Sequence, residues 1–300
     1  MSDPTLYVTT ITFWSALGVF AIGAGIQQWA KPTKPAITEI AEVPLESPPP
    51  LPWHEETERE KVPTRFYCSY DLIGLIFVFF LFFALTAMNI QASAEKDLVM
   101  TPMGLLISIG FQFMIAGGVL ATVISRIHPV DWLGLKWRKW PWVFLIAPAA
   151  VLFIWIIMGV LQGSGYMKWI ESLGVDPVQE AVKLLQQSND TLVIWLMTIA
   201  AVIVAPLCEE LVFRGYLYPL AKKYAGPWVG GLFSAVVFGC AHGNLGALLP
   251  LTIFGILMVI IYQKTGSLWA TIAVHFCFNG AAVAIQLLDR YYHFLPENSL

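Results

Sequence analysis

Charged residues are scarce in this chain. Asp, Glu, Lys and Arg make up 12% of its 300 residues, whereas hydrophobic residues make up 57%. Soluble domains carry about 25% charged residues, so this composition excludes an ordinary soluble protein and predicts an all-α integral membrane protein. The net charge of -3 and the lack of a basic stretch give no indication of a nucleic-acid partner.

Cysteine is also scarce, and this excludes most of the chemistry that needs it. The four cysteines form no CxxC pair and no disulfide framework. Cys240 and Cys277 are each two residues from a histidine, about 200° around a helix, so neither forms a Cys–His nucleophile. No serine has a base at a suitable spacing, and the H-E-x-x-H pattern of zinc peptidases is absent.

Apolar stretches are what the chain has in abundance. A membrane-spanning helix needs about 20 such residues, and the catalytic candidates described below fall on the C-terminal ones. The sequence predicts about eight spans, at 6–29, 72–91, 103–124, 142–161, 191–218, 227–242, 245–262 and 268–288. The first span lacks a positively charged leading segment and is too long for a signal peptide.

Lys and Arg are distributed unequally between the two sides of such a bundle. The loops 30–71, 125–141, 219–226 and 263–267 hold twelve of them, the loops of the other side hold four, and Arg214 lies inside a span. The positive-inside rule therefore predicts that the richer side faces the cytoplasm and that both termini lie outside.

The loops and spans suggest a division into regions. Within the region before residue 190, Pro177 after Asp176 and the apolar spacing that follows predict an amphipathic helix near 176–188, on the outer surface. The predicted regions are an N-terminal transmembrane helix (1–30), a Pro- and Glu-rich flexible cytoplasmic loop (31–70), a transmembrane scaffold (71–189), a domain that carries the polar residues (190–290) and a tail (291–300).

Polar residues are concentrated inside three of the C-terminal spans. An ionisable side chain in the bilayer core costs roughly 2.5–3.5 kcal/mol, so such residues usually mark a pathway or a reactive cavity. At about 1.5 Å per residue, four of these residues lie roughly 16–22 Å along their helices from the predicted cytoplasmic ends, and so near one depth in the membrane. They are Glu209, His242, His275 and Asn279. The three groups are Glu209-Glu210 with Arg214, Phe238 with His242, and His275 with Asn279.

Helical spacing assigns different roles to the two glutamates. Glu210 and Arg214 are i, i+4 with the acid first, the favourable order for an ion pair, so we predict a structural pair. Glu209 points about 100° away and is predicted to be the chemical carboxylate. The i, i+4 spacing also places the supporting residue Phe238 beneath a histidine and sets the second histidine beside the asparagine.

A desolvated carboxylate and two imidazoles together suit the water-mediated hydrolysis of an amide. The carboxylate is a general base, and a histidine can share or relay its proton. A His–Asn pair can donate hydrogen bonds to a developing oxyanion. Each group alone is more often structural than catalytic, and only the joint arrangement favours chemistry.

The motifs E-E-x-x-x-R, F-x-x-x-H and H-x-x-x-N, in this order, resemble those of the CAAX protease and bacteriocin-processing (CPBP) family. That family includes the type II CAAX prenyl endopeptidases and the bacterial Abi proteins. The resemblance covers about residues 190–290. The motifs stand here as Glu209-Glu210-Leu211-Val212-Phe213-Arg214, Phe238-Gly239-Cys240-Ala241-His242 and His275-Phe276-Cys277-Phe278-Asn279.

The resemblance implies an intramembrane endopeptidase of a bacterial plasma membrane, with a cavity open to the cytosolic side and to lipid. It implies that Glu209 activates water with His242, and that His275 and Asn279 stabilise the oxyanion. Its substrate would be a membrane-embedded or lipidated peptide, of CAAX or bacteriocin type. No cofactor is favoured. The alternative is a zinc metalloendopeptidase, with Glu209, His242 and His275 as the three ligands of an open site.

Two other functions are compatible with the sequence. A non-catalytic immunity or scaffold protein could bind hydrophobic peptides with the same fold, although the complete motif set disfavours it. A proton-coupled transporter could also use intramembrane Glu, His and Arg. The confinement of polar groups to three helices, without inverted repeats or broken helices, disfavours the transporter.

Overall fold

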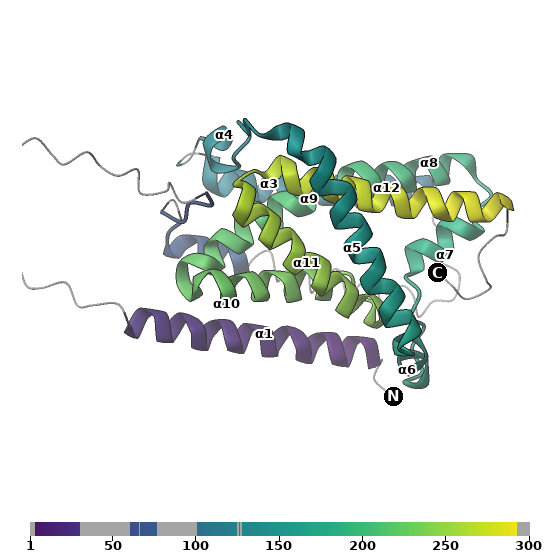
Figure 1. Cartoon of the computed structure of the whole chain (residues 1–300), viewed down its shortest axis with the longest axis horizontal. Helices are drawn as coiled ribbons and strands as arrows, with labels where there is room; N and C mark the ends of the chain where they lie inside the picture. Colours follow the sequence, from purple (N-terminus) through teal and green to yellow (C-terminus); the bar gives the residue numbers. More distant parts are fainter. Residues whose placement is uncertain are drawn as a thin grey trace, which may run out of the picture.

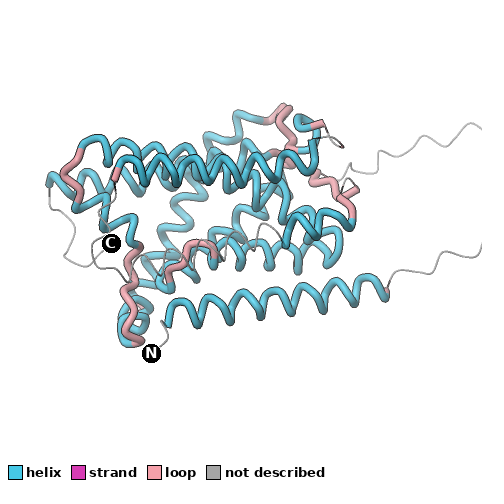
Figure 2. The backbone as a smooth tube through the Cα atoms, turned by 180° about the vertical axis from the view of Figure 1, so that it is seen from behind, coloured by secondary structure: helices cyan, strands magenta, loops and turns pink. Residues whose placement is uncertain are grey.

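The computed structural model describes residues 4–30, 61–65, 67–76, 101–124, 126 and 128–292. All regular secondary structure in these residues is helical (Figure 2), which confirms the predicted all-α class. In chain order the elements are α1 (Pro4–Trp29), α3 (Pro102–Ile124), α4 (Pro129–Trp132), η1 (Trp140–Trp142), α5 (Val143–Gly163), α6 (Tyr166–Ser172), α7 (Glu180–Gln187), α8 (Thr191–Ile199), η2 (Ala200–Val204), α9 (Ala205–Glu210), η3 (Leu211–Leu217), α10 (Tyr218–Cys240), α11 (Leu245–Thr265) and α12 (Leu268–Tyr292).

Six helical runs within the described residues are long and apolar enough to cross a membrane. One of them, Thr191–Cys240, is 50 residues long and contains two of the predicted spans. The predicted span 72–91 is described only as far as residue 76, and most of the 31–70 loop also lies outside the described residues. The protein therefore crosses the membrane several times, while the count of eight stays a prediction.

The long run reverses direction at Gly226, which has φ 80° and ψ 169°. A positive φ is readily adopted only by glycine, and the residue before a proline avoids helical ψ, so Gly226-Pro227 ends one helical segment and begins the next. This break separates the 191–218 and 227–242 spans that the sequence predicted.

Close packing of α1, α10 and α11 forms one side of the bundle (Figure 1). Phe20 of α1 stacks on Phe233 of α10 with ring centroids 4.7 Å apart. At Gly255 of α11, an added Cβ would lie 2.9 Å from the Cα of Ala235 on α10. Small residues let membrane helices approach closely where apolar side chains gain nothing by leaving lipid.

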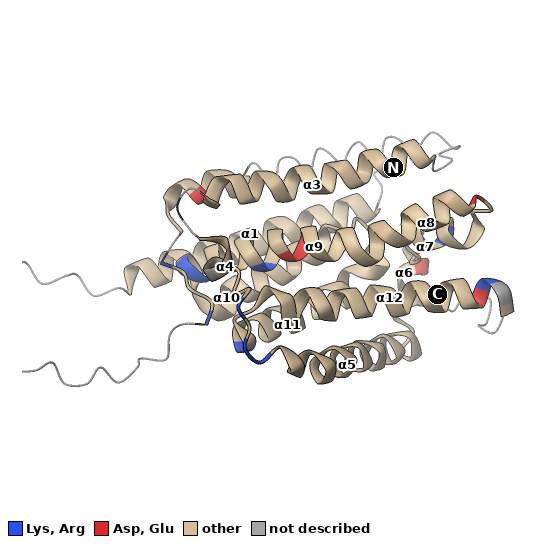
Figure 3. Cartoon of the chain, turned by 90° about the horizontal axis from the view of Figure 1, so that it is seen from above, with Lys and Arg blue, Asp and Glu red and all other residues tan. Residues whose placement is uncertain are grey.

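Contacts between loops define the two ends of the bundle. At one end, Lys222 Nζ donates to the carbonyl of Val62 (3.0 Å) and the amide of Leu268 to the carbonyl of Leu133 (2.9 Å). We call this the basic end, because Lys and Arg gather there (Figure 3). Its described residues are 61–65, 67, 126, 128–139, 222–226 and 264–268.

At the opposite end, α6 and α7 meet the turn between α10 and α11. Asn244 Nδ2 donates to the carbonyls of Asp176 and Val178, each at 3.4 Å, and the Tyr166 hydroxyl donates to the carbonyl of Leu245 at 3.1 Å. We call this the α6–α7 end. It comprises residues 164–190, 241–246 and 289–292.

The predicted amphipathic helix begins later than Pro177 indicated. Helix α7 starts at Glu180, because Asp176 and Pro177 are held in an extended segment against α11: an added Cβ at Gly246 would lie 2.4 Å from the carbonyl oxygen of Pro177. The Lys183 ammonium hydrogen-bonds the Asp176 carboxylate and lowers its pKa. The buried Leu185 of α7 packs in one cluster with Val283 of α12, so the apolar side of α7 is directed at the bundle.

The close approach of α10 and α11 leads to a stability prediction. Gly255→Ala places a methyl group 2.9 Å from backbone, and such overpacking costs about 1–3 kcal/mol. We expect a lower melting temperature in detergent than for Gly110→Ala, whose added Cβ would meet nothing within 4 Å. The control has the same gain in helix propensity. Equal melting temperatures would show that the contact is not tight.

Candidate active site

The two glutamates lie on a helical run that departs twice from α-helical geometry. The π-helical segments η2 and η3 flank α9, and each is followed within two residues by a proline, Pro206 or Pro219. Proline lacks the N–H and clashes with the carbonyl four residues earlier. Widening to i→i+5 bonds relieves this clash. Such segments are frequent at functional sites. They were not predicted from the sequence, although the two prolines are a visible signal for them.

The widened segments leave carbonyl groups that side chains from elsewhere satisfy. The amide of Ala205 bonds to Ala200, and Pro206 has no N–H, so the carbonyl of Ala201 accepts from Asn279 Nδ2 at 2.7 Å instead. On the other side of the glutamates, the carbonyl of Gly215 accepts from the Tyr67 hydroxyl at 2.5 Å. These two bonds fix the run on both sides of the glutamates.

Glu210 and Arg214 form the ion pair that their spacing predicted. Arg214 Nη1 donates to Glu210 Oε1 at 2.9 Å, and both residues are 0% exposed. The guanidinium lies 4.4 Å from the centroid of the Phe238 ring, a cation–π distance. Arg214 Nη2 also donates to the carbonyl of Gly255 at 3.4 Å. The pair therefore joins the long run to α10 and α11.

His275 of α12 contacts both glutamates. Its Nδ1 lies 2.9 Å from Glu210 Oε1, and its Nε2 lies 3.9 Å from Glu209 Oε2. Because the carboxylate of Glu210 accepts hydrogen bonds, Nδ1 carries the proton in the neutral ring and Nε2 presents its lone pair toward Glu209. Sequence spacing paired His275 only with Asn279, because helical periodicity relates residues of the same helix. It says nothing about contacts between α9 and α12.

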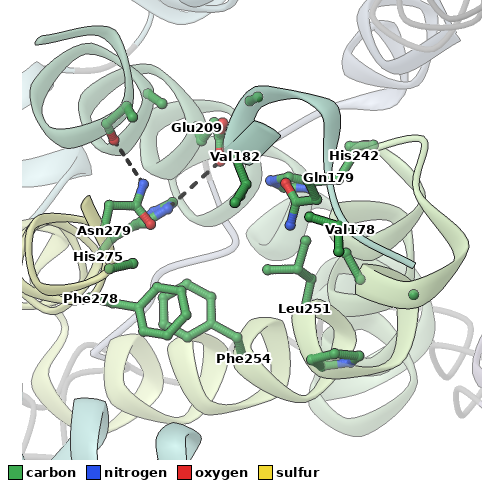
Figure 4. A pocket seen from close by; sticks show the side chains of 18 of the residues that line it. Val178, Gln179, Val182, Glu209, His242, Leu251, Phe254, His275, Phe278 and Asn279 are labelled. Atoms are coloured by element: carbon green, nitrogen blue, oxygen red, sulfur yellow. Dashed lines mark hydrogen bonds and ion pairs between the residues drawn. The ribbon is translucent and has the colours of Figure 1, made fainter. Parts of the chain in front are cut away.

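Glu209 differs from Glu210 in its surroundings. Its side chain is 26% exposed and lines a cavity of about 1550 Å³. Its Oε2 has no hydrogen-bond partner among the described residues. His242, His275 and Asn279 line the same cavity (Figure 4), whereas the three predicted supporting residues, Glu210, Arg214 and Phe238, do not.

His242 lies in the turn that follows α10, at the α6–α7 end. Its Nδ1 is 2.9 Å from the carbonyl oxygen of Phe238, so the neutral ring carries its proton on Nδ1 and leaves Nε2 as an acceptor. Figure 4 shows His242 across the cavity from His275 and Asn279. The histidine that contacts Glu209 is therefore His275, whereas the family resemblance implied a pairing of Glu209 with His242.

The alternative zinc site requires three side chains that converge on one metal ion. Among the described residues, no three His, Cys, Asp or Glu side chains are grouped so that they could hold a metal ion. Glu209, His242 and His275 line one cavity without converging on one point. The residues as placed therefore do not fit the three-ligand zinc centre.

Comparisons with known proteins agree with the motifs. Residues 191–281 match the type II CAAX prenyl endopeptidase Rce1-like family. The chain is 34% identical over 92 residues to the candidate membrane peptidase YdiL of Bacillus subtilis (strain 168), and 33% identical over 96 residues to the UPF0177 protein YxdF of Lactococcus lactis. No solved structure gives a significant match.

These similarities are confined to the region of the site. Each aligned segment covers 31% of this chain, and they cover 38% of YdiL and 52% of YxdF. The resemblance to the CAAX protease family is confirmed for residues 191–281, and the relatives are bacterial. The protein is accordingly a multi-pass bacterial membrane protein with an Rce1-like region in its C-terminal half.

The buried ion pair leads to a prediction about the two acids. Glu210→Ala leaves the Arg214 guanidinium buried without its carboxylate, which costs about 3–5 kcal/mol. We expect a marked loss of folded yield and of melting temperature in detergent. Glu209→Ala is the matched control, because that side chain faces the cavity and has no ion-pair partner as close. If the two variants melt alike, Glu210 is not the structural acid.

Proposed function

We propose that this protein is an intramembrane peptidase that hydrolyses a peptide bond of a membrane-associated substrate. The observation that carries the proposal is that Glu209 of α9, His242 of the turn after α10, and His275 and Asn279 of α12 line one cavity. The buried ion pair of Glu210 and Arg214 lies outside the cavity lining. A reactive carboxylate with a neighbouring imidazole in a largely apolar cavity is the arrangement that general-base hydrolysis requires.

The gap between Glu209 and His275 suits one water molecule. Glu209 Oε2 and His275 Nε2 are both acceptors and lie 3.9 Å apart, so a water can donate one hydrogen to each at about 2.8 Å. In the proposed reaction the water oxygen attacks the carbonyl carbon as Glu209 takes its proton. The proton passes to the amide nitrogen, the C–N bond breaks, and the carboxylic acid and the amine are released. Proton transfer between these two products then gives the carboxylate and the ammonium.

The remaining residues have supporting parts in this proposal. The Glu210 carboxylate orients His275 by accepting from Nδ1, and one N–H of Asn279 is committed to the carbonyl of Ala201. The second N–H of that amide is available to the oxyanion. His242, across the cavity, contacts the substrate or the departing amine. In this proposal His275 takes the role beside Glu209 that the family resemblance implied for His242.

The proposed reaction is metal-independent. Glu209 is needed as a free base, and among the described residues no three His, Cys, Asp or Glu side chains are grouped so that they could hold a metal ion. A carboxylate that bound zinc could not also accept the proton of the water. The donor set as placed supports the glutamate mechanism over the metal-dependent alternative.

Two glutamines give the cavity a means to hold a peptide backbone. Gln112 of α3 and Gln286 of α12 line it, and among the described residues their buried Oε1 atoms have no hydrogen-bond partner. An unsatisfied buried acceptor is costly unless water or a ligand supplies a donor. Gln286 is seven residues, or two helical turns, beyond Asn279 and so lies on the same face of α12. An extended hydrophobic or lipidated peptide could donate its N–H groups to both.

The first test is peptide cleavage by the purified protein in detergent. We expect Glu209→Gln to lower kcat by a factor of about 10²–10⁴, the usual contribution of a general base, and a zinc chelator to leave the wild-type rate unchanged. The substrates would be a library of prenylated and unmodified hydrophobic peptides. Glu180→Gln, the same change at an exposed residue outside the cavity, is the control.

Each other outcome has a definite meaning. Loss of cleavage on chelation, restored by added zinc, would overturn the metal-independent mechanism. Full activity of Glu209→Gln would overturn the assignment of the base. Peptide binding without cleavage by the wild type would favour the non-catalytic scaffold protein.

The glutamine acceptors yield a separate prediction. Replacing the amide of Gln286 or Gln112 by Leu removes an acceptor and keeps the cavity filled. We expect KM for a cleaved peptide to rise about fivefold to tenfold, the value of one hydrogen bond, with kcat little changed. Gln187→Leu, on the exposed side of α7, should leave KM unchanged. An unaltered KM in both cavity variants would remove these residues from the substrate site.

A further inference from the structure

The two ends of the bundle differ in charge. Contacts bring together at the basic end four separate segments, which carry nine of the described Lys and Arg residues, whereas the α6–α7 end carries three of them. Loops rich in Lys and Arg remain in the cytoplasm. The basic end therefore faces the cytoplasm, and the α6–α7 end faces the opposite side of the membrane. The three described Lys and Arg residues of the α6–α7 end are Lys168, Lys183 and Arg290.

The cavity is charged at one end only. Five Asp, Glu, Lys or Arg residues line it, and all except Glu209 lie between residues 168 and 183, at the α6–α7 end. No described residue of the basic end lines the cavity. The side chains of Asp176 and Lys183 are 58% and 35% exposed. The cavity therefore has a water-accessible mouth at the α6–α7 end.

His242 lies in the same layer as this mouth. It follows the last residue of α10 by two positions, and Asn244, two residues further, donates to the carbonyls of Asp176 and Val178. Figure 4 shows His242 beside Val178 and Gln179 at the edge of the cavity. His242 thus lies at the α6–α7 end, close to the charged and water-exposed side chains of the mouth.

We propose that the substrate reaches Glu209 from the extracytoplasmic side of the membrane, through the mouth formed by residues 168–183. The substrate class is then a peptide presented at the outer face, such as an exported or outward-facing anchored segment. A prenylated C-terminus on the cytoplasmic side would meet the basic end, none of whose described residues lines the cavity. This access differs from the cavity open to the cytosolic side that the family resemblance implied. The substrate class rests on the proposed peptidase function, whereas the sidedness of the cavity does not.

Cysteine accessibility in intact bacterial cells tests the sidedness. The full chain, with its four cysteines replaced by serine, receives one new cysteine: Lys183→Cys at the mouth, Ala282→Cys within the cavity, or the control Lys136→Cys at the basic end. The probe is the anionic, membrane-impermeant reagent 2-sulfonatoethyl methanethiosulfonate. Because a charge crosses a bilayer poorly, we expect labelling of the first two to be faster than the third by on the order of tenfold or more.

Permeabilisation should remove the difference between Lys183→Cys and Lys136→Cys. Labelling of Lys136→Cys alone in intact cells would overturn the proposal, as would labelling of Ala282→Cys only after permeabilisation. If the cysteine-free chain does not fold, reporters fused after residue 300 of the wild-type chain decide which side of the membrane the α6–α7 end faces. Alkaline phosphatase is expected to be active and green fluorescent protein dark, and the reverse would overturn the proposal.

The peptidase function is decided separately by cleavage in detergent, where both faces are accessible. A chain that labels from outside but cleaves nothing keeps the sidedness and loses the peptidase. An impermeant peptide that is cleaved in detergent should also be cleaved by intact cells. Cleavage of that peptide only by inverted vesicles would overturn the extracytoplasmic substrate.

Discussion

The Glu210 carboxylate is the group on which the rest of the site depends. One of its oxygens accepts from Arg214 at 2.9 Å and contacts His275 Nδ1 at 2.9 Å, and all three side chains are buried. A buried charge is stable only when it has partners. Arg214 lies on the same helical run as Glu210, whereas His275 lies on α12. Through Arg214 the network reaches Phe238 and the backbone of Gly255, and through His275 it reaches α12.

This network explains how two adjacent glutamates acquire different environments. Their directions differ by about 100° around the helix, which is enough to put Glu210 wholly inside the protein and leave Glu209 at the wall of the cavity. Because Glu210 holds His275 by Nδ1, the other nitrogen of the ring is directed at Glu209. A structural ion pair thus sets the tautomer and position of the imidazole beside the reactive carboxylate.

The prolines that flank α9 give the run its unusual geometry. Pro206 and Pro219 would each break an ordinary helix, and widening to π geometry keeps the run continuous across the site. Carbonyls of this run accept hydrogen bonds from side chains elsewhere in the protein, that of Ala201 from Asn279 and that of Gly215 from Tyr67. Local irregularity of the backbone therefore becomes a set of attachments that hold the glutamates in place.

The sequence by itself determined the all-helical membrane class, the i, i+4 pair of Glu210 and Arg214, and the different directions of Glu209 and Glu210. These follow from hydropathy and helical periodicity, which act within one helix. The contact of His275 with both glutamates, the use of Asn279 by Ala201 and the late start of α7 were decided only by tertiary structure. They depend on how α12 and α11 pack against other helices, and no periodicity within a single helix encodes the distance between atoms on two of them.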